Sequence, residues 1–191
     1  MACTSVTLGR NESCKDNVGG IKNIYIGSWD SYMWGVLNLT ESSVIQDMSG
    51  EAEWTVPTLY KYELKSDANT FEEANEVSNE NQTSFWTQTL TLSLKKQTAQ
   101  SQEELVKMSK GQVVVVIEDY NGVYRAAGLY RGLDVQMNTS TGGAMGDMNG
   151  YTLTMTGVDP YPARHLSVDD DCHPFDGGAL FDVSTVVITD N

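Results

Sequence analysis

The residues that could carry out chemistry are sparse, and the two histidines, His165 and His173, are the natural starting point. A Ser-His-Asp hydrolase of the common type holds its serine on a sharp turn with the pattern Gly-x-Ser-x-Gly. This pattern does not occur anywhere in the sequence. A Ser-His-Asp triad could be drawn around either histidine, but without this pattern we do not expect a hydrolase.

Two other segments resemble ligand-binding motifs, but each lacks a required residue. The acidic run Asp169–His173 could hold a divalent cation, yet it lacks the alternating acids, central glycine and final glutamate of an EF-hand loop. Gly142–Gly146 is glycine-rich like a phosphate-binding loop, but no Lys-Ser/Thr pair follows it. We interpret the first segment as an acidic loop and the second as a flexible hairpin tip.

The three cysteines, Cys3, Cys14 and Cys172, are widely spaced and form no Cys-x-x-Cys motif. Neither a zinc site nor a redox pair is therefore supported, and we expect three reduced thiols. Together with the preceding motifs, they predict a protein that is not an enzyme, with no catalytic residue, no cofactor and no bound metal.

The net charge of the 191-residue chain is −14, which is its most informative bulk property. Binding to nucleic acid through phosphates needs a basic surface that releases counterions, so this charge argues against it. An acidic wall would instead repel a DNA duplex and let it slide without sticking. No apolar run approaches the roughly 18 residues that span a bilayer. The first ten residues lack the apolar core of a signal peptide, so we expect synthesis in a cytoplasm.

The helices and strands that would position a functional site lie mainly within residues 101–157. Ser101 and Glu104 match a capping box, which predicts a helix over about Gln102–Lys110. Within it, Leu105 and Met108 lie on the apolar side and are expected to pack on a sheet. Gly111 would end the helix.

A run of β-branched residues and two hairpins follow the helix. Val113–Ile117 cannot be a half-solvated strand, so it must be covered on both faces or be buried between subunits. Asn121-Gly122 is the strongest short hairpin signal in the chain, with Val123–Tyr130 as the return strand. A second hairpin joins Leu133–Met137 to Tyr151–Thr156, whose alternation predicts one buried and one wet face.

The domain organisation follows from the segments on either side. Ile21–Trp29 is the first predicted strand, and the polar residues 1–20 before it form an N-terminal arm. The β domain covers residues 21–157. Residues 158–191 form an acidic C-terminal arm, which we expect to pair with a sheet edge of its own chain or of a partner.

Residues 53–65 and 84–95 both alternate between apolar and polar side chains, which predicts a long antiparallel hairpin. The connection Ser66–Thr83 contains five acids and no Lys or Arg, and we interpret it as a loop. It is either a solvated surface loop, or a loop that contacts a neighbouring subunit or lines an acidic lumen. The five acids are Asp67, Glu72, Glu73, Glu76 and Glu80.

Two blocks of the sequence carry a family resemblance. The first is Cys14–Ile26, with the sequence CKDNVGGIKNIYI. The second begins with Asn121–Gly128 (NGVYRAAG), continues at Gly146–Gly157 (GDMNGYTLTMTG) and has Pro162-Ala163 beyond. With these blocks the chain resembles virion structural proteins of tailed phages and prophages of Bacteroidetes-type hosts, and is similar to their tail tube, ring or hub subunits.

The resemblance implies a mainly β, tail-tube-like fold: a β-sandwich or barrel with one short flanking α-helix and a long hairpin. It implies homo-oligomeric rings, hexameric or larger, whose hairpins line a channel for genome passage. Other tail or neck proteins would be the partners, and DNA would pass without specific binding. The protein would be located in the tail or neck of the virion after assembly in the host cytoplasm. The five acids would then lie at the lumen or between rings.

The sequence is also compatible with a function of a different class. A β-sandwich on a virion could be a binding module for carbohydrate or a host surface, with Trp29, Tyr32 and Trp34 as stacking groups. Rings or tubes in solution would support the structural subunit, whereas a monomer that responds to glycans would support the binding module.

Overall fold

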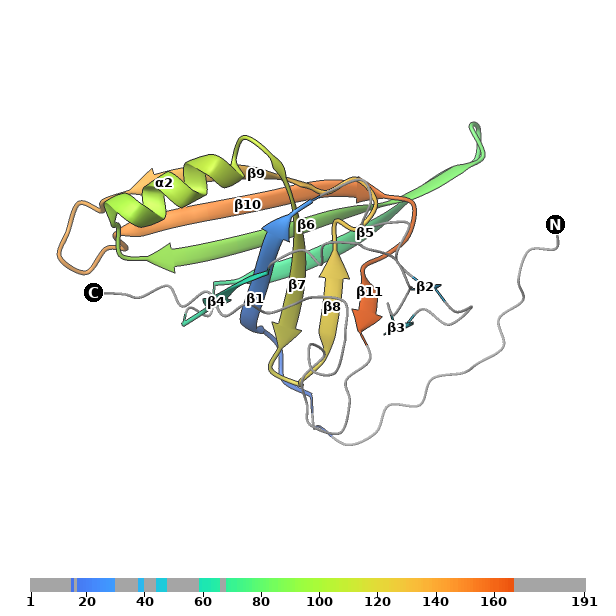
Figure 1. Cartoon of the computed structure of the whole chain (residues 1–191), viewed down its shortest axis with the longest axis horizontal. Helices are drawn as coiled ribbons and strands as arrows, with labels where there is room; N and C mark the ends of the chain where they lie inside the picture. Colours follow the sequence, from blue (N-terminus) through green and yellow to red (C-terminus); the bar gives the residue numbers. More distant parts are fainter. Residues whose placement is uncertain are drawn as a thin grey trace, which may run out of the picture.

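The computed structural model describes residues 15, 17–29, 38–39, 44–47, 59–65 and 68–166 (Figure 1). These residues are mainly in β-strands, as predicted, with one short helix. The elements are β1 Ile21–Ser28, β2 Asn38–Leu39, β3 Val44–Asp47, β4 Tyr60–Glu63, β5 Thr70–Ser78, β6 Thr83–Lys95, α2 Ala99–Met108, β7 Gln112–Asp119, β8 Tyr124–Ala127, β9 Leu133–Ser140, β10 Gly150–Asp159 and β11 Arg164–Leu166.

One hydrogen-bonded network of strands is arranged in two parts, which we call the long-strand layer and the short-strand layer. The long-strand layer has the order β9-β10-β6-β5, and the short-strand layer has the order β4-β1-β7-β8-β11-β3-β2. Neighbours pair antiparallel, except that β3 and β11 are parallel. The layers are joined where the start of β7 pairs with the start of β9, and the long strands cross the short ones steeply (Figure 1).

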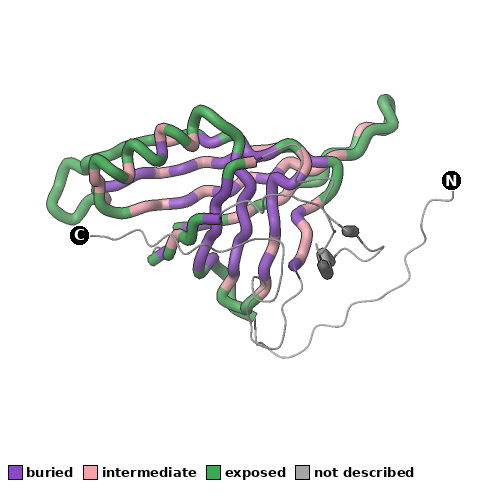
Figure 2. Tube along the Cα trace, viewed as in Figure 1, coloured by how far each residue is buried: buried purple, intermediate pink, exposed green. Residues whose placement is uncertain are grey.

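Strand β7 carries the β-branched run and is buried on both faces, which confirms the prediction for Val113–Ile117. Val113, Val115 and Ile117 face the main core, where they lie in one cluster with side chains of the long-strand layer such as Leu92 and Leu153. The alternate residues belong to a second apolar cluster on the other face of the short-strand layer. Figure 2 shows the resulting column of buried residues along β7 and its neighbours. Each such side chain contributes roughly 1.5–3 kcal/mol by leaving water.

The helix α2 begins three residues earlier than predicted. Its N-cap is Thr98, whose hydroxyl accepts a hydrogen bond from the Ser101 N–H, so the capping box at Ser101 and Glu104 is wrong. Thr98 is held because its carbonyl accepts a hydrogen bond from the Tyr151 hydroxyl on β10. Leu105 is buried in the core as expected.

The predicted pairing of residues 53–65 with 84–95 is also wrong. Strand β4 pairs with β1, and β6 pairs with β10 on one side and β5 on the other. The acidic segment Ser66–Thr83 is therefore a strand rather than a loop over most of its length, and the long hairpin is β5–β6. Residues 53–58 and Asp67 lie outside the described residues. Asparagine, and to a lesser degree glutamate, are uncommon in strands, but here the edge position leaves their side chains solvated.

The sheet also extends past the predicted domain boundary at residue 157. Strand β10 continues to Asp159, and β11 pairs with both β8 and β3. The remainder of the predicted C-terminal arm, residues 167–191, lies outside the described residues, as does most of the N-terminal arm. The last residues of the N-terminal arm are attached to the β7–β8 turn, because Val18 and Asn121 exchange two hydrogen bonds.

The buried carboxylate of Glu118, on β7, connects this strand to β1 by hydrogen bonds. Glu118 is 3% exposed, and its oxygens accept hydrogen bonds from Lys22 Nζ at 2.6 Å, Asn23 Nδ2 at 2.7 Å and the Tyr25 hydroxyl at 3.3 Å. Burial alone would raise the pKa of Glu118, but these donors together hold its pKa below the usual value. The cluster is therefore a structural anchor that works in the ionised state.

We predict that Glu118→Gln changes how stability depends on pH. Because folding lowers the pKa of Glu118, the ionised carboxylate stabilises the fold above its ordinary pKa of 4.5, and this stabilisation is lost as the pH falls through the folded-state value. Urea unfolding of wild type and variant should differ most near pH 7 and converge in acid. Glu80→Gln, in an exposed turn, is the control. Parallel curves for wild type and Glu118→Gln would contradict the anchor.

Candidate functional site

The most distinctive feature of the surface is a hairpin that leaves the sheet. The last β6–β10 pair joins Trp86 to Asp159, whereas the β5–β6 pairing continues to Ser78 and Thr83. Residues 76–85, which we call the projecting hairpin, thus extend beyond β10 with only each other as strand partners among the described residues (Figures 1 and 2). Isolated two-stranded hairpins are marginally stable in water, so this arm is suited to gaining a further contact.

The four predicted acids that the structure describes lie on or beside this hairpin, but they do not share one surface. Glu72 and Glu76 are exposed and point to the same side of β5, and Glu80 is exposed in the turn. Glu76 accepts a hydrogen bond of 2.8 Å from the Thr87 hydroxyl. Glu73 points to the opposite side of the strand and is partly buried.

Glu73 belongs to a polar bridge between the two layers. One of its oxygens accepts hydrogen bonds from the Ala163 N–H at 2.6 Å and from Gln88 Nε2 at 3.4 Å. Gln88 is 1% exposed, and its own oxygen accepts the Gly128 N–H at 2.9 Å. We call this the Glu73–Gln88 bridge. It ties the base of the projecting hairpin to the short-strand layer and to the connection between β10 and β11.

Gly128 shows how closely the layers approach at this bridge. Its φ of +71° is a conformation that side-chain-bearing residues rarely adopt. A Cβ atom there would also lie 2.7 Å from Leu133 Cγ and 3.1 Å from the Val113 carbonyl oxygen. Glycine is therefore required where the N–H must reach Gln88.

The outer side of the long-strand layer is a surface of hydroxyl groups. Thr89 and Thr91 on β6 lie opposite Thr156 and Thr154 on β10, and the pattern continues at both ends. The side chains on this side, which we call the hydroxyl face, are Glu72, Glu76, Thr87, Thr89, Thr91, Ser93, Asp134, Gln136, Asn138, Thr152, Thr154 and Thr156. These residues include three acids. The same alternation also places Lys95, at the end of β6, and the apolar Ala74, Phe85 and Val158 on this side. The opposite side of the same strands packs into the core.

Both outer strands of the long-strand layer have an edge without a strand partner among the described residues. Strand β5 pairs only with β6, and β9 pairs with β10 and, at two residues, with β7. Since the layer consists of four strands that alternate in direction, β5 and β9 run antiparallel to each other. Such edges are templates for pairing with another chain unless charges or bends protect them.

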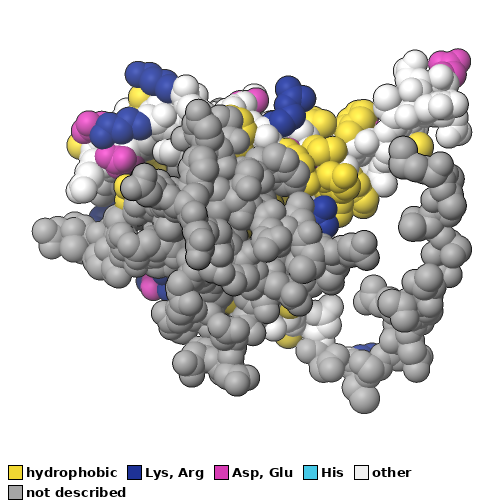
Figure 3. All heavy atoms as spheres, turned by 45° about the vertical axis from the view of Figure 1, so that its right-hand side comes forward, with side chains coloured by type: hydrophobic (Ala, Val, Ile, Leu, Met, Phe, Trp, Pro, Cys, Tyr) yellow, Lys and Arg dark blue, Asp and Glu magenta, His cyan; other side chains and the backbone are white. Residues whose placement is uncertain are grey.

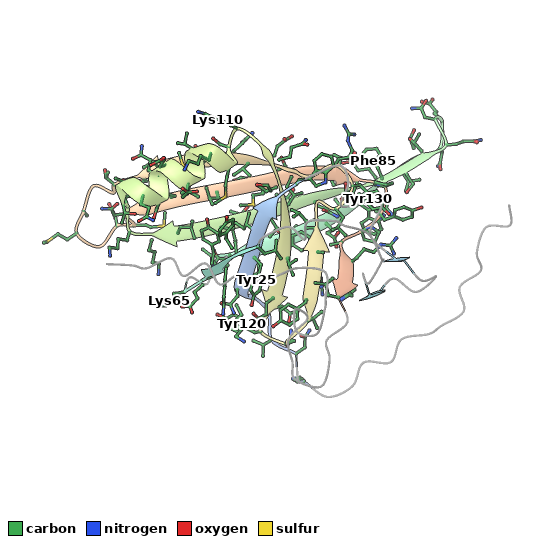
Figure 4. The ribbon with its side chains drawn as sticks, viewed as in Figure 1. Tyr25, Lys65, Phe85, Lys110, Tyr120 and Tyr130 are labelled. Carbon is green, nitrogen blue, oxygen red and sulfur yellow. The ribbon has the colours of Figure 1, made fainter. Side chains whose placement is uncertain are left out.

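Aromatic side chains gather at the base of the projecting hairpin (Figures 3 and 4). Tyr161 is 49% exposed and lies 5.4 Å from Tyr130 between ring centroids, and the Arg164 guanidinium lies 4.9 Å from the Tyr161 ring. Phe85 comes from the hairpin itself and Trp86 follows it on β6, and both are half-buried. We call these residues the aromatic base. Exposed apolar clusters of this kind usually mark interaction sites.

The other residues considered from the sequence do not form a site. His165 is half-buried on β11, where burial and the nearby Arg125 lower its pKa. The segment Asp169–His173 and all three cysteines lie outside the described residues. Within the described residues no metal-binding cluster occurs. Trp29 is half-buried and donates its ring N–H to the Leu129 carbonyl oxygen, so it is not a free stacking group. Tyr32 and Trp34 are not described.

The loop Gly142–Gly146 is the predicted hairpin tip between β9 and β10, and it has a defined geometry. Asp147 accepts hydrogen bonds from the Gly143 N–H at 2.8 Å and the Ala144 N–H at 2.7 Å. These two N–H groups lower the pKa of Asp147. The loop therefore uses its glycines to close on its own aspartate rather than on a phosphate.

Sequence reasoning missed Gln88, although a signal was present. Gln88 falls in phase with Trp86, Leu90 and Leu92 on the apolar side of an alternating strand. A polar residue at such a position needs a buried partner, because an unsatisfied amide costs free energy. The partners, Glu73 and Gly128, come from other parts of the chain and could not be named from this pattern.

Comparison of the chain with protein-family models, with curated proteins and with solved structures finds no match. Within the part of the chain that the structure describes, no helix has the length and apolar character needed to cross a membrane.

We predict that Gln88→Leu destabilises the protein by about 1–3 kcal/mol, because it leaves the buried Gly128 N–H without its acceptor and removes a donor to Glu73. Gln136→Leu is the matched control, since Gln136 is exposed on the hydroxyl face. Urea unfolding of both variants measures the difference. Equal stability of the two would show that the Glu73–Gln88 bridge does not hold the layers.

Proposed function

We propose that this protein is a structural subunit of a phage tail tube or tail or neck ring, and that it assembles into rings that enclose a channel for genome passage. The observation that carries the proposal is the long-strand layer. Its outer side is a hydroxyl face that is rich in threonine and carries three acids, with the base Lys95 at one end. Among the described residues, β5 has no strand partner along its outer edge, and β9 has one at only two residues. The sequence resemblance to tail subunits points in the same direction.

Closure of a ring would give the outer edges of β5 and β9 a strand partner at the same time. In a ring of equivalent subunits, β5 of one copy meets β9 of the next, and the two run antiparallel because the layer has an even number of alternating strands. Each subunit then adds four strands to a closed barrel, which removes every free edge of the layer. The hydroxyl face becomes the inner wall, and α2 with the short-strand layer lies outside it.

Such a wall suits a DNA conduit. Threonine hydroxyls are neutral and hydrated, and the nearby acids, such as Glu72 and Asp134, repel phosphates that approach closely. At physiological salt this repulsion decays over roughly 8 Å, so it acts only on DNA near the wall. Lysine or arginine side chains at the same positions would bind the duplex in a salt-dependent way and slow its passage. Other tail or neck proteins would contact the ends of the channel.

A second candidate, a binding module for carbohydrate or a host surface, is favoured by one observation. The aromatic base exposes Tyr161 beside Arg164, and aromatic rings next to polar groups stack well on sugars. In that case the protein would be a monomer, and glycan binding would be lost in Tyr161→Ala.

The first test of the proposed function is assembly of the purified full-length chain. We expect closed or stacked rings in negative-stain images and a matching mass by light scattering, because paired edges are more stable than free ones. A monomer that persists at high concentration would overturn the ring, and glycan binding by that monomer would establish the second candidate.

A second prediction concerns the wall itself. In the double variant Glu72→Lys and Asp134→Lys, rings should still form, because both side chains are exposed on the hydroxyl face. The rings should now retain duplex DNA in a filter-binding assay, and added salt should release it. Glu103→Lys with Glu104→Lys, on the exposed side of α2, is the matched control and should retain little DNA. Equal retention by both variants would place the hydroxyl face away from the channel.

A further inference from the structure

The charges of the described residues are segregated along the long axis of the molecule. From residue 66 to residue 94 the chain contains five acids and no Lys or Arg. Three of these acids, Glu72, Glu76 and Glu80, are exposed on β5 or in its turn. The space-filling view shows an acidic group and no basic one on the visible side of the projecting hairpin (Figure 3). The projecting hairpin is therefore negative, and Arg164 lies in the aromatic base beside it.

The opposite end of the long-strand layer carries exposed lysines, and the acids of α2 nearby, Glu103 and Glu104, are paired with Lys107. Strand β6 runs from the projecting hairpin to Lys95, and Lys95 and Lys96 are both exposed there. The N-terminus of α2 lies at the same end (Figure 1), and its dipole adds partial positive charge. The one acid in the adjacent β9–β10 loop, Asp147, already accepts two backbone N–H groups.

Each end also carries an exposed apolar side chain. Val77 on the projecting hairpin is 66% exposed, and Met145 at the tip of the β9–β10 loop is fully exposed. A flexible methionine packs readily on irregular apolar surfaces and makes favourable contacts with aromatic rings. The aromatic base beside the hairpin offers such rings.

We infer that the projecting hairpin of one copy binds the Lys95–Lys96 end of a second copy, head to tail, with Met145 of the second copy packed against the hairpin and its aromatic base. The inference rests on the proposed function and adds to it the partner and polarity of the hairpin. Of the three ways to join two copies end to end, hairpin to hairpin sets acid against acid, and lysine end to lysine end sets base against base. Only the head-to-tail contact brings opposite charges together.

Head-to-tail contact is a heterologous interface, and between the ends of stacked copies, where no rotation closes it, such a contact builds a stack of indefinite length. It also gives a role to a strand pair that extends beyond its own sheet. The hairpin gains packing partners that its own described residues do not supply, which offsets the marginal stability of a two-stranded arm.

Charge reversal at one end at a time tests this pairing. Variant A carries Glu76→Lys and Glu80→Lys, so that both of its ends are basic. Variant B carries Lys95→Glu and Lys96→Glu, so that both of its ends are acidic. Each variant alone should need at least about tenfold more protein than wild type to form stacks, because like charges face each other. Equimolar A and B together should stack as wild type does, in alternation.

The outcomes separate this inference from the function on which it rests. If wild type forms no rings, the proposed function fails. If wild type stacks and either A or B stacks equally well alone, or if the mixture of folded A and B does not stack, the head-to-tail pairing is overturned. Circular dichroism confirms folding. Should A misfold, the isosteric pair Glu76→Gln and Glu80→Gln replaces it, and stacking of that variant must lose its sensitivity to salt.

Matched single variants localise the effect. Lys95→Glu and Lys110→Glu make the same charge change, but Lys110 follows the C-terminal end of α2, away from both surfaces (Figure 4). We expect Lys95→Glu alone to weaken stacking by several fold and Lys110→Glu to leave it unchanged. Equal effects of both would mean that only net charge matters, which would overturn the inference.

Discussion

The need to cover β7 on both faces is the constraint on which the rest of the structure depends. Six consecutive residues of this strand are buried, so it requires an apolar layer on each side. On one side the long-strand layer and Leu105 of α2 supply it. On the other side the short-strand layer builds its second cluster with Tyr25 and Tyr124. Once β7 is enclosed in this way, the long-strand layer has only one side left for solvent, and that side is the hydroxyl face.

The polar interactions within this arrangement hold its elements in position. Glu118 anchors β1 to the end of β7, and the Glu73–Gln88 bridge sets where the β5–β6 hairpin leaves the sheet. Both use buried groups whose hydrogen bonds are made within the chain. The structure describes four of the five acids that are predicted at the lumen or between rings. Glu73 makes its hydrogen bonds within the chain, so Glu72, Glu76 and Glu80 remain for contacts with other molecules.

The strongly acidic composition and the proposal of self-assembly are compatible because of where the charges lie. An acidic protein that binds itself must bury apolar or hydrogen-bonding surfaces and set its acids against water or against bases. The free edges of β5 and β9 provide hydrogen-bonding surfaces without charge pairing. The lysines at the far end of β6 provide the bases that the projecting hairpin would need.

Local patterns in the sequence determined which segments are strands in the second half of the chain. The run Val113–Ile117, the Asn121-Gly122 turn and the alternation of Tyr151–Thr156 each specify a structure through neighbouring residues alone. No local pattern in the sequence indicates which distant strands pair with each other. Strand β6 alternates whatever its partner, so only the packed structure decided that β5 and β10 flank it and that β4 joins β1. The same holds for the N-cap of α2, which Tyr151 selects from another strand, and for Glu73, whose direction depends on Gln88 and Ala163. The sequence by itself thus determined the total charge and which of these segments form strands. Tertiary packing decided which acids face solvent, because burial and hydrogen bonding depend on contacts between residues far apart in the chain.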